Sequence, residues 1–446
     1  MISNLIKKYN VAAPRYTSYP TVPCWDVESW SPEQWLESVK KSYSESAREG
    51  ISLYIHLPFC ESLCTYCGCN TRITKNHTVE EPYINAVLRE WEMYCRVLGT
   101  RPRIREIHLG GGTPTFFSPK NLETLIKGLL ASAEIVAGAE FSFEAHPANT
   151  TYQHLQTLFD LGFRRLSLGI QDFDPRVQTI INRKQSVEQV EQVTTQARQL
   201  GYTSINYDLI YGLPLQNMAS VQSTVDKVIK LLPDRIAYYS YAHVPWVKPG
   251  QRKFTEADLP QDNEKRALYE KGRRLLTDAG YKDIGMDHFS LKTDKLYKAS
   301  KAGALHRNFM GYTDQYTQLS IGLGVSSISD SLYAFAQNTK QLSEYLQQVR
   351  EGVFPLVKGH ILTEKDLLNR REITNLMCKG YTTMNKADLK LIKRLAILEH
   401  DKLVEFDYDK LKVTSVGKAF LRNICMAFDE RLLSNSSESQ IFSKAV

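Results

Sequence analysis

The segment Tyr54-Ile-His-Leu-Pro-Phe-Cys-Glu-Ser-Leu-Cys-Thr-Tyr-Cys-Gly-Cys69 directly follows an alternating stretch that predicts a strand. Within it, Cys60, Cys64 and Cys67 have the spacing Cys-x-x-x-Cys-x-x-Cys. Three thiolates on one tight turn can hold three corners of an iron–sulfur cube, which leaves the fourth iron open to a small molecule. Because catalytic metal sites keep an open position and structural sites do not, the loop predicts a catalytic 4Fe–4S cluster.

Two other uses of these cysteines are less well supported. A zinc site usually takes four ligands in two pairs separated by a longer loop, whereas Cys95, Cys378 and Cys425 are isolated. A disulfide is disfavoured because we expect no secretory signal before the loop, and cytosolic thiols stay reduced. Cluster binding is therefore preferred, with zinc or a purely structural role as the alternative.

Composition restricts the class of protein. The 446 residues suffice for two domains, or for one large domain with appendages. The 56 basic and 49 acidic residues give a net charge of +7 that is not concentrated in a tail, so we expect no nucleic-acid partner. No apolar run approaches membrane-spanning length, and the first residues lack the apolar core of a secretory signal. We therefore expect a cytoplasmic protein without a membrane partner.

From residue 52 to about residue 240, short apolar segments alternate with amphipathic segments. The predicted strands are Ser52–His56, Arg105–Leu109, Glu140–Glu144, Arg165–Leu168, Ser204–Ile210 and Arg235–Ser240. The predicted helices between them are Pro82–Val97, Pro119–Ser132, Thr151–Leu161, Ser186–Leu200 and Met218–Leu231. Such a series predicts a parallel sheet with helices outside, either an open sheet or a partial barrel.

The chemically distinctive motifs fall at or just beyond the predicted strand ends, where a parallel barrel carries its chemistry. They are the cysteine loop, the turn Gly110-Gly-Gly-Thr-Pro-Thr115, and the side chains of Glu144, Gln171 and Asp208. Consecutive glycines let the backbone approach a ligand closely, although they also suit a tight strand-to-helix turn. A carboxylate at a strand end can bind an ammonium or a ribose hydroxyl, or simply pair with a nearby arginine. Their common position around one loop favours a binding site.

Beyond Ala242 the alternation weakens. The region 283–324 is rich in Gly, His and aromatic residues and is expected to cover the site, and Arg307 within it is a candidate carboxylate clamp because of its forked guanidinium. From Leu362 onward, the pattern predicts helices over Thr363–Gly380, Lys386–His400 and Lys418–Leu432, with a small β-wing over Leu403–Val413. This winged-helix-like pattern does not itself imply DNA binding.

With these motifs assembled, the chain resembles the radical S-adenosylmethionine superfamily, and within it the oxygen-independent coproporphyrinogen III oxidases (coproporphyrinogen dehydrogenases). The superfamily likeness rests on the cysteine triad, with Tyr66 before its last member, and on the glycine turn. The branch likeness runs nearly from end to end, through Pro14-Arg-Tyr-Thr-Ser-Tyr-Pro20, Cys67-Gly-Cys-Asn70, Gly169-Ile-Gln-Asp-Phe173, Asp208-Leu-Ile-Tyr-Gly-Leu-Pro214, Tyr241-Ala-His243, Gly285-Met-Asp-His-Phe289, His306-Arg-Asn-Phe309 and Arg422-Asn-Ile-Cys425.

The expected fold is α/β: a partial (β/α)6 TIM-like barrel with an N-terminal arm and a mainly helical, winged-helix-like C-terminal domain. We expect an arm or lid over residues 1–50, a radical S-adenosylmethionine catalytic domain with covering loops over 51–330, a linker over 331–361 and the helical domain over 362–446. The lid would shield a reactive radical from water.

The resemblance also implies the cofactors. Cys60, Cys64 and Cys67 would hold a 4Fe–4S cluster and thereby generate the radical, with Tyr54 beside them, and S-adenosylmethionine would chelate the open iron. The cofactor pocket, which in this family can hold a second S-adenosylmethionine, would comprise Tyr54, Tyr66, Gly68, Gly111, Gly112, Thr113, Glu144, Gln171, Arg183, Asp208, Tyr239, Ala242 and Ile328. Cys69 is not expected to bind iron. The chain departs from the family at His146, where an acidic residue is expected and where a histidine would titrate near neutrality.

The implied reaction is the anaerobic oxidative decarboxylation of two propionates of coproporphyrinogen III to vinyl groups, which gives protoporphyrinogen IX in haem synthesis. A 5′-deoxyadenosyl radical would remove hydrogen from the propionate β-carbon, and loss of carbon dioxide and one electron would follow. We expect a monomer that takes electrons from a small protein such as flavodoxin or ferredoxin. The alternatives are a haem chaperone, a haem-degrading enzyme or a methyltransferase of the same lineage; a chaperone would usually lack the Cys67–Asn70 extension and the Pro14–Pro20 segment, both present here.

Overall fold

A computed structural model describes residues 2–246, 248–384, 388–434 and 442. At its centre is one curved sheet, whose strands follow the order β16-β15-β14-β13-β1-β4-β5-β6-β7-β8-β10-β9 within the described residues. The strands predicted between residues 52 and 240 are all present and adjacent strands run parallel; they are β1 (Ile51–Leu57), β4 (Arg103–Gly111), β5 (Glu134–Ala145), β6 (Phe163–Gln171), β7 (Ser204–Tyr211) and β8 (Arg235–Ser240).

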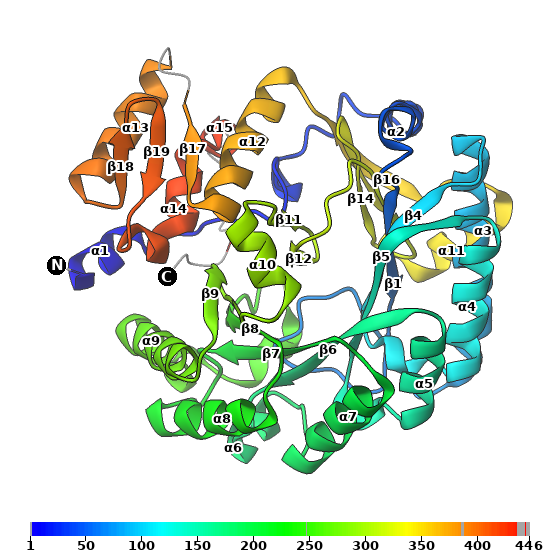
Figure 1. The fold of residues 1–446 in the computed structure, drawn as a ribbon, viewed down its shortest axis with the longest axis horizontal. Coiled ribbons are helices and arrows are strands. Elements are labelled where there is room, and N and C mark those ends of the chain that lie inside the picture. Colours follow the sequence, from blue (N-terminus) through cyan, green and yellow to red (C-terminus); the bar gives the residue numbers. More distant parts are fainter. Residues whose placement is uncertain (1, 247, 385–387, 435–441, 443–446) are drawn as a thin grey trace.

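Helices cover the outer face of this sheet, which curves into an incomplete barrel (Figure 1). The helices that alternate with the parallel strands are α3 (Glu80–Leu98), α4 (Pro119–Ala131), α5 (Tyr152–Asp160), α6 (Pro175–Ile180), α7 (Val187–Leu200) and α8 (Met218–Leu231). The predicted α/β fold with a partial barrel is confirmed. Several of these helices begin at a residue whose side chain accepts a backbone N–H, such as Ser118, Thr151, Ser186 and Asn217.

Alternation along each strand gives the barrel an apolar outside and a polar inside. In β1, Ile51, Leu53, Ile55 and Leu57 are fully buried in the main hydrophobic core, together with helix residues such as Trp91. The intervening β1 residues carry hydrogen-bonding side chains, and Ser52 donates to Glu106 on the neighbouring strand at 3.0 Å. Because side chains alternate between faces, the polar set must point into the barrel.

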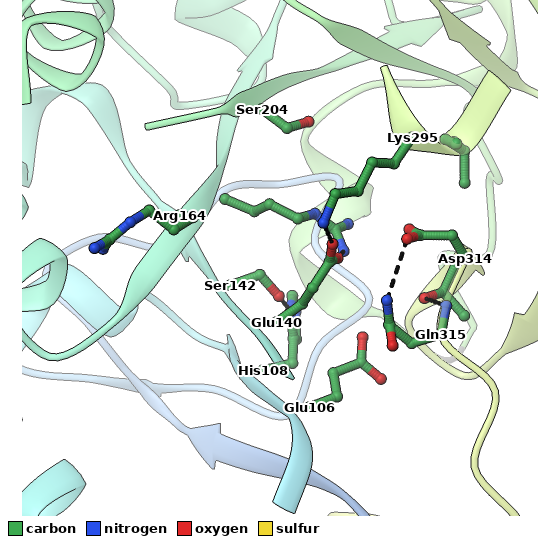
Figure 2. Close-up of polar contacts among 12 residues, drawn as sticks. Glu106, His108, Glu140, Ser142, Arg164, Ser204, Lys295, Asp314 and Gln315 are labelled. Carbon is green, nitrogen blue, oxygen red and sulfur yellow. Dashed lines mark hydrogen bonds and ion pairs between the residues drawn. The ribbon is translucent and has the colours of Figure 1, made fainter. Parts of the chain in front are cut away.

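A network of ion pairs, most of whose members are buried, lies among the polar side chains of the sheet (Figure 2). Glu140 on β5 pairs with Arg165 at 3.1 Å and with Lys295 at the start of α10 (Lys295–Ala302). On β8, Arg235 pairs with Asp294 at 2.7 Å. Figure 2 also shows Gln315, whose amide nitrogen lies 3.2 Å from a carboxylate oxygen of Asp314. Burying a charge is costly unless it is paired, so these ion pairs allow charged side chains to lie inside the barrel.

The sheet continues beyond the parallel strands on both sides. β10 (His288–Ser290) and β9 (Lys282–Gly285) add antiparallel strands after β8, with α9 (Asp262–Asp278) packed beside α8. On the other side, β13 (Ser320–Leu323) runs parallel to β1 and leads to β14 (Ile328–Asp330). In place of the linker expected over 331–361, the structure has β15 (Ala334–Asn338), α11 (Leu342–Glu351) and β16 (Leu356–Ile361), because the apolar side chains of β15 are buried in the sheet.

A smaller unit follows, with its own hydrophobic core. It contains α12 (Glu364–Lys379), α13 (Leu389–His400), and a sheet of β17 (Tyr381–Thr383), β18 (Val404–Asp407) and β19 (Lys410–Val413). The predicted helix Lys386–His400 begins at Leu389, and its residue Lys386 lies outside the described residues. Of the region expected as the C-terminal domain, residues 435–441 and 443–446 also lie outside them.

The single helix predicted over Lys418–Leu432 is wrong. A 3-10 turn over Gly417–Phe420 leads into α14 (Leu421–Met426), and a separate helix α15 (Glu430–Ser434) follows. Asp429 lies between them: one carboxylate oxygen accepts the Leu432 N–H at 2.9 Å, and the other accepts the Tyr16 hydroxyl at 3.0 Å. Asp429 thus caps the start of α15 and also binds the N-terminal segment through Tyr16, so α14 and α15 are separate helices.

The first 50 residues divide between the two units. α1 (Ile2–Tyr9) and the segment that follows it contribute Leu5, Ile6 and Tyr16 to the core of the smaller unit. By contrast, α2 (Pro32–Ser46) packs against β15, β16 and α3 at the edge of the large sheet. The segment between these helices crosses the molecule between the smaller unit and the barrel (Figure 1). In the described residues, no helix is both long and apolar enough to span a membrane.

Candidate active site

The cysteine loop leaves the end of β1 and closes on itself. Its two ends form the short parallel strands β2 (Phe59–Cys60) and β3 (Arg72–Ile73). The Cys67 N–H donates to the Cys64 carbonyl at 3.1 Å, which makes a tight turn between two of the cysteines. Cys60, Cys64 and Cys67 are half-buried, reduced, and line one cavity of about 450 Å³. A cavity of this size suits a small organic ligand.

Polar partners from the neighbouring strands lie beside the sulfur atoms. The Thr113 hydroxyl lies 3.3 Å from Cys60 Sγ, and the Arg183 guanidinium donates to Cys64 Sγ at 3.7 Å. Burial raises the pKa of Cys60 to about 11, whereas a hydrogen bond with Cys69 lowers the pKa of Cys67. Metal binding must therefore displace a proton from Cys60, as it does wherever a thiol becomes a ligand.

Two carboxylates, Glu144 and Asp208, also line the cavity. Glu144 at the end of β5 accepts the Gly111 N–H at 3.2 Å and lies 3.4 Å from His108 Nε2. Asp208 on β7 accepts hydrogen bonds from Ser167 and Asn206, each at 2.9 Å. Burial, and then the charge of Glu144, raises the pKa of Asp208 to about 6. Two acidic groups beside a cavity can bind an ammonium or sugar hydroxyls.

Most of the predicted cofactor residues line this one cavity. They are Cys60, Cys64, Tyr66, Cys67, Gly111, Gly112, Thr113, Glu144, Gln171, Arg183 and Asp208. Gln171 ends β6 with a left-handed φ of 65°, which is strained for a residue other than glycine and frequent at functional sites. In the part of the chain that the structure describes, the cavity lining does not include Tyr54, Gly68, Tyr239, Ala242 or Ile328.

Two of these five residues, Tyr54 and Tyr239, contact or line the surroundings of the cysteine cavity. The Tyr54 ring stacks on His108 at a centroid distance of 6.0 Å, and its hydroxyl lies 3.1 Å from His56 Nδ1. Tyr239 lines a second cavity of about 110 Å³, which shares Glu144, Ser167 and Asp208 with the first. Ile328 instead packs against a separate hydrophobic cluster that contains Trp25 and Phe335.

His146 also lines the cysteine cavity, and its expected titration near neutrality is wrong. Burial, together with the charge of Arg183, lowers the pKa of His146 to about 3. The imidazole is therefore neutral, and its Nδ1 accepts the Ala148 N–H at 3.1 Å. A neutral acceptor in this position caps the turn after β5 rather than supplying charge to the site.

Sequence reasoning missed several polar residues that line the two cavities, notably His108, Ser167, Asn206 and Arg235. Ser167, Asn206 and Arg235 each lie an even number of residues from a residue of the same strand that was identified, namely Gln171, Asp208 and Tyr239. Asn206 and Asp208, for example, are two positions apart and point to the same face of β7. A polar residue repeated every second position in a buried strand was therefore the available signal.

Comparisons with known proteins agree with this geometry. A family model described as "Radical SAM superfamily" matches residues 54–228, which include the cysteine loop and the strands up to β7. The oxygen-independent coproporphyrinogen III oxidase of Escherichia coli is 39% identical over 453 residues, which cover 99% of this chain and 98% of that protein. This chain belongs to the family of oxygen-independent coproporphyrinogen III oxidases.

Other members of the oxygen-independent coproporphyrinogen III oxidase family are similarly close. The Synechocystis sp. oxidase is 36% identical over 100% of this chain and 98% of its own length. The solved structure of coproporphyrinogen III oxidase (HemN) from Escherichia coli, described as a radical SAM enzyme, superposes with a TM-score of 0.89. The two chains are 37% identical, and the superposition covers 96% of this chain and 98% of the Escherichia coli chain.

Membership of this oxidase family and of the radical SAM superfamily implies a 4Fe–4S cluster and S-adenosylmethionine. The donor set fits such a cluster, because three sulfurs from one loop face one cavity. In the described residues, no three His, Cys, Asp or Glu side chains converge on a single metal-ion position. A 4Fe–4S cluster would take one thiolate on each of three irons, so its three sulfur ligands need not converge on one point. The cavity also leaves room beside the three cysteines for an organic ligand.

Proposed function

We propose that this chain converts coproporphyrinogen III to protoporphyrinogen IX without oxygen, by oxidative decarboxylation of two propionate side chains to vinyl groups. The observation that carries the proposal is the end-to-end identity to oxygen-independent coproporphyrinogen III oxidases. A loop of three half-buried cysteines beside a cavity lined by Glu144 and Asp208 supports the same chemistry.

In this proposal Cys60, Cys64 and Cys67 hold the cluster, and the remaining cavity residues hold S-adenosylmethionine. When bound, the reduced cluster would supply one electron that cleaves S-adenosylmethionine to methionine and a 5′-deoxyadenosyl radical, and this radical would remove hydrogen from a propionate β-carbon. Arg183 fixes one rim of the site, because its Nε donates to the Gly169 carbonyl at 3.1 Å while Nη1 faces Cys64. Its positive charge stabilises thiolate ligands.

The carboxylates of Glu144 and Asp208 orient the cofactor. Asp208 and Glu144 keep lone pairs toward the cavity and are placed to accept hydrogen bonds from an ammonium or from ribose hydroxyls. Tyr66 and Phe116 give the same cavity apolar surface, which excludes water from a reactive centre. A second S-adenosylmethionine near Tyr239 stays a prediction, as do a flavodoxin-like or ferredoxin-like donor, a monomeric state, and a cytoplasmic location without nucleic-acid or membrane partners.

The test is an anaerobic assay of the cluster-reconstituted protein with coproporphyrinogen III, S-adenosylmethionine and a reductant. We expect protoporphyrinogen IX, with two molecules each of carbon dioxide and 5′-deoxyadenosine for every substrate consumed. A methylated product, an opened ring, or stoichiometric binding of haem without consumption of S-adenosylmethionine would contradict the proposal. These outcomes correspond to a methyltransferase, a haem-degrading enzyme and a haem chaperone.

Turnover is expected to fall as the pH is lowered through about 6, the pKa to which burial and Glu144 raise Asp208. Below that pH Asp208 is protonated and loses its negative charge, whereas above it the carboxylate can accept hydrogen bonds from the cofactor. The measurement is kcat/KM for S-adenosylmethionine from about pH 5 to 8. Asp208→Asn should lower turnover at neutral pH and remove this acid limb, while the exposed Asp226→Asn should retain it. An unaltered acid limb in Asp208→Asn would assign the titration to another group.

A further inference from the structure

Three arginines from distant parts of the chain surround one carboxylate at the side of the barrel. Arg15 comes from the N-terminal segment, Arg307 from β11 (His306–Asn308) and Arg422 from α14. Asp287 lies within the electrostatic reach of all three, and of Lys265. Its carboxylate is 3.9 Å from Arg15 Nη1, while Arg307 Nη2 lies 3.5 Å from the Arg15 carbonyl. Among the described residues, Arg15 and Arg307 alone carry two positive charges beside the single carboxylate of Asp287.

The arginine cluster borders the active site. The Arg15 guanidinium lies over the Tyr239 ring at 5.9 Å, and the Arg307 guanidinium lies over the Tyr312 ring at 4.6 Å. Both tyrosines line the second cavity, which joins the cysteine cavity through Glu144, Ser167 and Asp208. Figure 1 shows the N-terminal segment passing close to β11 and β12 (Gly311–Thr313) on its way to α2. An anion bound here would thus lie beside the bound cofactor.

Arg422 and Arg307 have different roles within this arginine cluster. Arg422 donates to the carbonyls of Ala13 and Pro14, the latter at 3.0 Å, and so fixes the N-terminal segment. Burial, and then the charge of Arg15, lowers the pKa of Arg422 to about 10. Arg307 is different: in the described structure its Nε and Nη1 are buried and donate no hydrogen bond. Buried charged donors of this kind are costly unless an anion accepts from them.

We propose that Arg307, with Arg15 beside it, binds a propionate carboxylate of coproporphyrinogen III, an inference that rests on the proposed function. The substrate carries four carboxylates, which suits a cluster with excess positive charge. S-adenosylmethionine is a poorer occupant because its sulfonium and ammonium give it a net positive charge. The bound propionate is one that the product retains, since charge-assisted hydrogen bonds stabilise the carboxylate against loss as carbon dioxide.

Binding measurements on the cluster-loaded protein test this assignment. Equilibrium dialysis without oxygen would compare coproporphyrinogen III with its tetraamide, which keeps the shape and removes the charges. We expect wild type to prefer the acid, and Arg307→Gln to weaken binding of the acid by roughly 10- to 100-fold with little effect on the amide. Arg15→Gln should have a smaller effect in the same direction, and Arg307→Lys should restore part of the loss. Arg96→Gln, whose side chain is 74% exposed on α3, is the matched control.

The outcomes separate this inference from the proposed function. An unchanged preference for the acid in Arg307→Gln would overturn the inference, as would an effect confined to the affinity or stoichiometry of S-adenosylmethionine. An equal loss of acid and amide binding would indicate a merely structural role and would also overturn it. Failure of wild type to convert coproporphyrinogen III, with the arginine-dependent preference intact, would refute the proposed reaction and leave the carboxylate site standing.

Discussion

A Cys64→Ala variant is expected to lose both the visible absorbance of a 4Fe–4S cluster and all turnover, while it remains folded. Only two thiolates would remain for three cluster corners, and the Arg183 guanidinium would lose the sulfur that it faces at 3.7 Å. The side chain of Cys64 is half-exposed in a loop, so its truncation creates no core cavity. We expect the free energy of unfolding of the metal-free protein to change by less than about 1 kcal/mol.

Cys95→Ala is the matched control for this experiment. Cys95 is also reduced and partly buried, but it lies on α3 and its thiol donates to the Ser132 hydroxyl at 3.7 Å. That variant should keep full cluster absorbance and turnover. Absorbance spectra, iron content and product analysis after anaerobic reconstitution would decide the matter. An intact cluster with full activity in Cys64→Ala would refute both the ligand assignment and the radical chemistry.

The parallel strands were predictable because each is buried on its outer face and ends in chemically distinctive residues. β7, for example, was expected over Ser204–Ile210 and runs to Tyr211. β5 begins earlier than expected. The prediction missed its first half, which contains the exposed Ile135 and the left-handed Gly138. Neither feature suggests a strand, and only pairing with β4 makes that half extended. Three of the strands from β13 to β16 were hard to predict because β13, β14 and β15 have only three to five residues, and β13 joins the sheet through the distant β1.

The site was partly predictable for a different reason. The carboxyl ends of parallel strands share one edge, so motifs at successive strand ends converge whatever lies between them. That argument brought together Cys60, Thr113, Glu144 and Asp208, which line one cavity. It could not bring in Arg15 or Arg422. Their approach to Arg307 depends on how the chain's two ends pack against each other, and no local pattern records a contact across more than 400 residues, such as that of Arg422 with Pro14.

A Gly112→Ala variant is expected to reduce turnover by roughly 100-fold, the loss that a displacement of about 1 Å can produce in an active site. A Cβ at Gly112 would lie 2.6 Å from the carbonyl carbon of Pro58 and 2.9 Å from the Leu57 carbonyl oxygen. These are backbone atoms, so the turn itself must move. The move breaks the 2.8 Å hydrogen bond from the Gly112 N–H to Leu57, and it separates Thr113 from Cys60.

This variant differs from the cysteine variant in what it leaves intact. All three cysteines remain in their loop, so cluster absorbance should persist while the affinity for S-adenosylmethionine and the rate both fall. Gly99→Ala is the control: Gly99 has a left-handed φ of 70°, and a Cβ there would meet no atom within 4 Å. Its left-handed backbone should cost about 1 to 2 kcal/mol in stability without affecting turnover. If Gly112→Ala kept wild-type rates, close approach of this backbone would not be what shapes the cofactor site, and the glycine turn would be only a connection between β4 and α4.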